Sequence, residues 1–97
     1  MTEVFLDPGA AEDLEDAADY LDEQTPGLDV RFVAEVQRTL RRLSENPRIA
    51  QEVGPGVHRI GLYGFSYNVY YRIEEPGVVV FAILHQRRDP RQWQRRL

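Results

Sequence analysis

The chain has 97 residues, a formal net charge of −4, no cysteine, two histidines and twelve basic residues, all of them arginine. A chain of this length forms one domain with one hydrophobic core. Without cysteine or lysine, the protein has no disulfide, no thiolate chemistry, and no lysine to act as Schiff base or general base.

The N-terminal residues and the two histidines exclude further classes of protein. His58 and His85 do not cluster with carboxylates at ligand spacing, so we expect no metal and no other cofactor. The first residues lack the basic and apolar regions of a signal peptide, and the longest apolar run, Val78–Leu84, is too short to cross a bilayer. We therefore expect a cytoplasmic protein without membrane contact.

Acidic and basic residues are segregated along the chain. Residues 1–30 carry ten acids and no base, a net charge of −10, and residues 31–97 carry twelve bases and six acids, a net charge of +6, which together give −4. The acidic segment would repel phosphate, which argues against direct wrapping of nucleic acid on that side.

The first half of the chain predicts a short strand followed by a helical hairpin. Val4–Leu6 is the strand candidate, and Asp7-Pro8 has the residue types of a helix start. Apolar residues recur at helical spacing from Ala10 to Gln24, and Thr25-Pro26-Gly27 ends that helix. A second amphipathic helix is predicted from about Asp29 to Glu45.

The second half predicts three strands after a loop at residues 48–56. The strands are Val57–Leu62, Tyr67–Glu74 and Val78–His85, and one helical turn can begin at Pro90. Short turns between consecutive strands predict antiparallel pairing. The expected fold is α+β, in the order β-α-α-β-β-β, with an antiparallel sheet covered on one face by the helical hairpin and a single domain over residues 1–97.

Two motifs together resemble one known family. The first is Gly-Phe-Ser-Tyr-Asn-Val-Tyr-Tyr-Arg-Ile at residues 64–73, and the second is His-Gln-Arg-Arg-Asp-Pro at residues 85–90, followed by Trp93. With the order of the elements, they resemble the RelE/ParE superfamily of toxins from bacterial type II toxin–antitoxin systems, over residues 10–96. The match is closer to the ParE-like, or plasmid stabilisation, branch.

The resemblance implies a toxin that a cognate antitoxin holds in check. Antitoxins of this kind pair a DNA-binding region, here expected to be a ribbon-helix-helix, with a tail that folds on the toxin, so DNA contact would come only through the antitoxin. ParE-like members are associated with inhibition of DNA gyrase, whereas RelE-like members cleave mRNA in the ribosomal A site.

RNA cleavage needs groups that transfer protons as well as groups that neutralise phosphate. Arg59, Arg72 and Arg88 can neutralise charge and His85 can act as an acid, but only Glu52 or Tyr71 is left to serve as the base. RelE-like enzymes rely on lysine and a C-terminal tyrosine, and this chain has neither. We therefore expect no catalytic residue and favour gyrase inhibition by binding; a ribosome-dependent mRNA endonuclease and an inert relative are the alternatives.

The predicted target-binding residues follow the strands of the second half. They are Arg59, Arg72, His85, Arg87, Arg88 and Trp93. Structural roles compete at three of them: His85 as a partner of the backbone or Asp89, Arg87 in a salt bridge to the first helix, and Trp93 folding the tail onto the sheet. If the strand continued beyond His85, Arg87 and Arg88 would point to opposite sides.

The predicted antitoxin-binding residues lie on the acidic first helix. They are Glu12, Asp16, Asp19 and Glu23. A solvated helix surface is the alternative role. The charge split would attract a basic antitoxin tail to the helical hairpin and the sheet edge.

Overall fold

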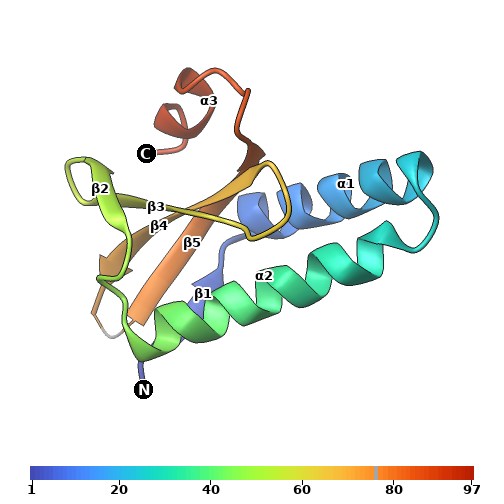
Figure 1. Cartoon of the computed structure of the whole chain (residues 1–97). Coiled ribbons are helices and arrows are strands. Elements are labelled where there is room, and N and C mark those ends of the chain that lie inside the picture. Colours follow the sequence, from blue (N-terminus) through green and yellow to red (C-terminus); the bar gives the residue numbers. More distant parts are fainter. Residues whose placement is uncertain (76) are drawn as a thin grey trace.

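The computed structural model describes residues 1–75 and 77–97 and shows a sheet with a helical hairpin on one face and a short helix on the other (Figure 1). The elements in chain order are β1 (Glu3–Leu6), α1 (Pro8–Gln24), α2 (Leu28–Glu45), β2 (Gln51–Gly54), β3 (Val57–Gly61), β4 (Tyr67–Glu74), β5 (Gly77–His85) and α3 (Arg91–Gln94). The predicted α+β class and the hairpin over one sheet face are confirmed.

Local sequence signals place the helical hairpin as expected. The Asp7 carboxylate accepts a hydrogen bond of 2.9 Å from the Ala10 amide, and Pro8 occupies the first helical turn, where no amide is needed. Gly27 joins the helices with φ of 90°, a left-handed conformation that glycine adopts without steric cost. α2 then buries Phe32, Val36 and Leu43 against the sheet.

The sheet has the strand order β1-β5-β4-β3-β2. Strands β2 to β5 pair antiparallel with their sequence neighbours, as short turns require, whereas β1 pairs parallel with β5. One prediction was wrong: residues 51–54, expected to be part of a loop, form the edge strand β2. Its four residues include Gly54 at an irregularity in the register, so strand periodicity is hard to detect there.

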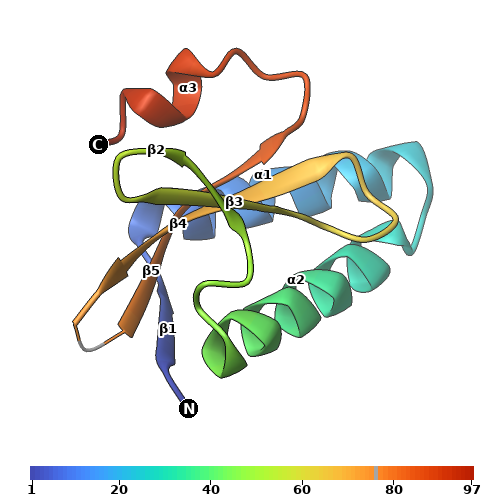
Figure 2. The same cartoon turned by 60° about the vertical axis from the view of Figure 1, so that its left-hand side comes forward.

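The two faces of the sheet carry two separate hydrophobic clusters. The face covered by α1 and α2, called the helix face, buries Val69 and Tyr71 of β4 and Val78, Val80 and Ile83 of β5 against the hairpin. The opposite face, called the tail face, carries a smaller cluster with α3 on it: Val57, Tyr70, Phe81, Ala82, Leu84 and Trp93. Figures 1 and 2 both place α3 on the side of the sheet away from α2.

A β-bulge in β5 decides toward which face of the sheet the last side chains of that strand point. Tyr70 lies opposite Ala82 and Tyr71 opposite Val80, so Phe81 is an extra residue without a partner on β4. Such an insertion shifts the alternation of every later side chain by one position. As a result Ile83 packs in the helix-face cluster and Leu84 in the tail-face cluster. His85, opposite Tyr67, follows on the helix face.

Candidate functional site

The structure separates the six predicted target-binding residues into two groups. Arg59, Arg72 and Trp93 belong to the tail face, since Arg59 lies opposite Tyr70 and Arg72 contacts Phe81. His85, Arg87 and Arg88 lie at the end of β5, where cavities open against α1. The residues predicted as one target-binding set therefore lie on two surfaces.

Trp93 is a packing residue in this structure. Its side chain is only 7% exposed and stacks on Tyr70, with ring centroids 5.4 Å apart and planes 22° from parallel. Gly54 makes room for it, because a Cβ there would lie 3.3 Å from the indole. Of the two roles expected for Trp93, the structure shows the one that folds the tail onto the sheet.

The two tail-face arginines differ in freedom. The Arg72 guanidinium lies 5.1 Å from the centre of the Phe81 ring and donates to the Glu74 carboxylate at 3.0 Å, so stacking and charge both restrain it. Arg59 is exposed on β3, next to the edge strand β2, and it forms no ion pair with the residues that the structure describes. Arg59 is thus the freer cation of this face.

The chain turns at His85 instead of continuing as a strand. β5 ends there, and the Arg88 amide donates to the His85 carbonyl at 2.9 Å, so strand alternation does not apply to Arg87 and Arg88. The Arg87 amide donates to His85 Nδ1 at 3.0 Å. Asp89, expected as a partner of His85, instead accepts two side-chain bonds from Arg91, and this hydrogen bonding lowers the pKa of Asp89.

The end of β5 faces cavities that the sequence did not predict. Tyr67 and His85 line three adjoining cavities, and Tyr20 of α1 lines two of them. Arg31 at the start of α2 lines one of about 310 Å³. Tyr20 is 55% exposed on α1. In the sequence, the signal for it is an aromatic residue set among the acids of the first helix.

The predicted antitoxin-binding residues all lie on the solvent side of α1. Glu12, Asp16, Asp19 and Glu23 are exposed, and in the described part of the chain none of them forms an ion pair. Asp13, one residue away, is different. Its carboxylate is 12% exposed and pairs with Arg96 at the end of the tail, so the salt bridge to the first helix comes from Arg96 and not from the predicted Arg87.

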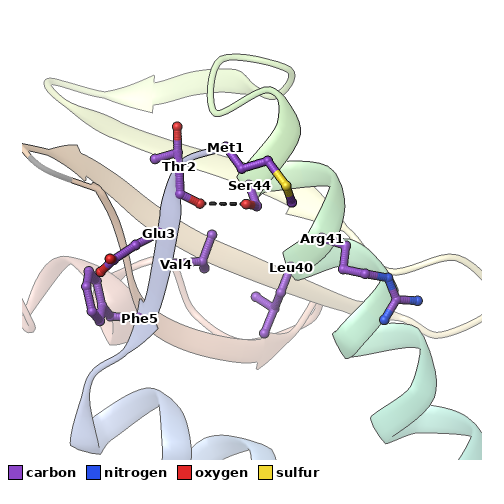
Figure 3. Close-up of a pocket in the computed structure, with 8 residues that line it drawn as sticks. All are labelled: Met1, Thr2, Glu3, Val4, Phe5, Leu40, Arg41 and Ser44. Atoms are coloured by element: carbon purple, nitrogen blue, oxygen red, sulfur yellow. Dashed lines mark hydrogen bonds between the residues drawn. The ribbon is translucent and has the colours of Figure 1, made fainter.

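A mainly apolar groove runs between the sheet edge and α2, as Figure 3 shows. Val4 of β1 and Leu40 of α2 line it, Met1 lies at one end, and the Arg41 side chain points outward. Ser44 closes that end, because its hydroxyl donates to the Thr2 carbonyl and its own carbonyl accepts from the Thr2 amide. The groove is thus a place where the hairpin and the sheet edge meet, with few polar groups.

Two features are absent from the part of the chain that the structure describes. Among the described residues, no three histidine, aspartate or glutamate side chains come together as metal ligands would. In the same part of the chain, no helix has the length and apolar character to span a membrane.

The family model for the ParE toxin of type II toxin–antitoxin systems matches residues 4–90. The chain therefore belongs to the ParE toxin family, and it is a type II toxin of the RelE/ParE superfamily. No curated protein matches the sequence at a significant level.

Solved structures agree on the fold at low sequence identity. The chromosomal ParDE system from P. aeruginosa matches with a TM-score of 0.77 and 17% identity, over 88% of this chain and 96% of that one. The isolated E. coli RelE toxin matches with a TM-score of 0.64 and 19% identity, over 98% of this chain and 95% of that one. A chain of the intact E. coli RelBE toxin–antitoxin complex matches with a TM-score of 0.63 and 19% identity, over 91% of this chain and 100% of that one.

Proposed function

We propose that this toxin inhibits DNA gyrase by binding it, without catalysing a reaction, and that a cognate antitoxin neutralises it in the cytoplasm. The proposal rests on one observation: both candidate general bases, Glu52 and Tyr71, already form hydrogen bonds away from the arginines. RNA cleavage would require Glu52 or Tyr71 to take a proton near the phosphate-neutralising arginines.

Tyr71 is poorly suited to act as a base. Its side chain is buried on the helix face, and its hydroxyl donates to the Pro47 carbonyl at 2.8 Å. Burial raises its pKa, which makes the phenolate harder to form. Arg59 and Arg72 lie on the tail face, so the sheet separates this hydroxyl from them.

The Glu52 carboxylate also forms a hydrogen bond away from the arginines. It accepts the Gly56 amide at 2.9 Å and so stabilises the turn between β2 and β3. Glu52 lies opposite His58, which stacks on Tyr71 of the helix face. Residues directly opposite each other in a sheet share a face, so Glu52 points away from Arg59.

A binding surface needs exposed cations and no proton relay, and the chain provides the cations. Arg59, Arg87 and Arg88 are exposed and form no ion pair within the described residues. Arginine is enriched among the residues that dominate binding energy at interfaces. We assign Arg59 on the tail face and Arg88 at the end of β5 as the main target contacts, with Arg72 and Trp93 packed on the tail face.

The gyrase proposal is tested with purified gyrase and the purified chain in a DNA supercoiling assay. We expect the wild type to block supercoiling and an Arg59→Gln/Arg88→Gln variant to need at least tenfold more protein. Arg38→Gln/Arg42→Gln is the matched control, because it removes the same two charges from exposed positions of α2. Codon-positioned mRNA breaks in a translating extract, with supercoiling unaffected, would instead establish the endonuclease.

For the antitoxin, the exposed acids of α1 support docking of a basic tail that follows a ribbon-helix-helix region. Neutralising Glu12, Asp16, Asp19 and Glu23 together should weaken antitoxin binding and flatten its salt dependence. Neutralising Glu45 and Glu75, which are exposed elsewhere, should change little. An affinity that is the same for all three proteins would rule out docking on this face.

A further inference from the structure

The cavities around Tyr67 form a site that the proposed gyrase contacts share only at Arg88. We call it the Tyr67 pocket. It has an inner lobe of about 310 Å³ and an outer lobe that opens toward Arg87 and Arg88. Both lobes share Tyr20, Tyr67 and His85.

The Tyr67 hydroxyl is an unused polar group in this pocket. The side chain is only 9% exposed, and its ring packs edge-on against Phe32 at 5.2 Å. The structure gives the hydroxyl no hydrogen-bond partner among the described residues, although every fully buried side-chain polar atom there has one. Burial and the neighbouring Tyr20 raise its pKa and Arg88 lowers it, which is consistent with a hydroxyl that faces these two residues.

His85 contributes a second donor. The Arg87 amide donates to its Nδ1 at 3.0 Å, so this nitrogen carries no proton. In the neutral imidazole the proton then lies on Nε2, which becomes a donor. The ring lies edge-on to Tyr67 with centroids 5.2 Å apart, so the two donors belong to one site.

The charges of the pocket favour an anion. Arg31 in the inner lobe and Arg87 and Arg88 in the outer lobe form no ion pair with the described residues. Asp16 brings one negative charge to the outer lobe. Asp13, which lines the adjoining cavity, is already neutralised by Arg96 at 2.6 Å.

The two lobes differ in the chemistry that they accept. The inner lobe combines the apolar walls of Leu21, Leu28 and Phe65 with the guanidinium of Arg31. This is a surface for a flat ring that carries hydrogen-bond acceptors on one edge. The outer lobe, with two free arginines, is a surface for a phosphate.

We propose that the Tyr67 pocket binds a purine nucleoside monophosphate, with the base in the inner lobe and the phosphate between His85, Arg87 and Arg88. Arg31 reads the base edge. Guanine presents two acceptors there, O6 and N7, whereas adenine presents an acceptor and a donor, so guanosine monophosphate binds more tightly than adenosine monophosphate. The site lies at the helix-face end of β5, apart from Arg59 and Arg72.

The test is a titration of the purified chain followed by amide chemical shifts. Guanosine monophosphate should bind saturably and shift the amides of residues 20–31, 64–67 and 85–88. Adenosine monophosphate, guanosine and inorganic phosphate should each bind several-fold more weakly. No saturable binding, equal binding of inorganic phosphate, or shifts confined to the tail face would overturn the proposal.

Variants distinguish binding in this pocket from a general attraction between opposite charges. Tyr67→Phe keeps the ring in the core and removes only the hydroxyl, and Arg31→Gln changes an exposed residue, so both should fold. Each should bind guanosine monophosphate about tenfold more weakly. Arg38→Gln, with the same loss of charge outside the pocket, should bind it as the wild type does; equal weakening in Arg38→Gln would overturn the proposal. The readout is independent of gyrase, so either proposal can fail without the other.

Discussion

Asp13 of α1 and Arg96 of the C-terminal tail form a two-pronged ion pair, with N···O distances of 2.6 and 3.0 Å. The same pair also hydrogen-bonds the backbone of β5 beyond the point where β1 stops pairing with it. Asp13 accepts the Ile83 amide at 2.9 Å, and Arg96 donates to the Phe81 carbonyl at 3.1 Å. One ion pair thus ties the first helix, the last strand and the tail together, and it protects two backbone groups at a strand edge.

Removing this ion pair should loosen the tail before it unfolds the domain. The Asp13 carboxylate raises the pKa of Arg96, so the guanidinium stays charged at every accessible pH. We expect Asp13→Ala to lower the free energy of unfolding by about 2–3 kcal/mol, because it leaves both Arg96 and the Ile83 amide unpaired. Arg96→Gln should cost about 1 kcal/mol, since that side chain is 31% exposed. Urea denaturation measures both.

A double-mutant cycle with Asp13→Asn and Arg96→Gln isolates the ion pair itself. Coupling of about 1 kcal/mol is expected. Arg95→Gln, an exposed neighbour in the same tail, is the control and should be neutral. Additive effects of the two variants would show that the pair contributes nothing beyond its separate hydrogen bonds.

Trp93 should report on the attachment of the tail, because it is the only tryptophan. Trp93→Ala is expected to cost about 3 kcal/mol and to expose the tail-face cluster. Gly54→Ala places a Cβ 3.3 Å from the indole, so the ring must move by a few tenths of an ångström, at a cost of about 1 kcal/mol. Thermal unfolding gives the stability, and Trp93 fluorescence gives the displacement. An unchanged emission spectrum in Gly54→Ala would contradict this packing.

Gly77 is required by the parallel contact between β1 and β5. A Cβ at this position would overlap the Glu3 carbonyl oxygen and would lie 3.2 Å from the Phe5 ring. Because the obstacle is backbone, the strand must shift, and Gly77→Ala should destabilise the protein by about 1–3 kcal/mol. Gly61→Ala is the matched control, since its nearest neighbour would be 3.6 Å away. It should be neutral or slightly stabilising in the same chemical denaturation series.

Two tyrosines should resist ionisation in alkali. Burial raises the pKa of Tyr67 and of Tyr71 above the ordinary value of 10.0. Since the folded-state pKa exceeds the unfolded one, the stability that these neutral phenols contribute is fully present below about pH 10 and is lost as the pH rises through the folded pKa. Ultraviolet absorbance titration should therefore show late ionisation coupled to unfolding.

Arg88 sharpens this prediction, because its charge lowers the pKa of Tyr67 against the effect of burial. Arg88→Gln should move the ionisation of Tyr67 to higher pH, and Tyr67→Phe should remove one of the two late transitions. If Arg88→Gln left the titration unchanged, the guanidinium would not face the Tyr67 hydroxyl, and the geometry of the Tyr67 pocket would need revision.

The sequence predicted most of the elements because their signals are local. Asp7 caps α1 through a side chain three residues away from its partner, and the two-residue period of a strand puts Val69, Tyr71 and Ile73 of β4 on one face. The short edge strand β2 was missed because its four residues are too few for a pattern. Asp13 was indistinguishable from its acidic neighbours, since its partner lies 83 residues away.

The amino-acid sequence by itself determined the family, the helical hairpin, the antiparallel meander and the absence of lysine and cysteine chemistry, because periodicity, caps and composition act over a few residues. Only the tertiary structure decided on which face of the sheet each basic residue lies. The bulge at Phe81 inserts one residue into β5 and turns His85 to the helix face, while Arg59 and Arg72 remain on the tail face. A one-residue shift in register reverses the side of every later side chain, and only the pairing with β4 reveals it.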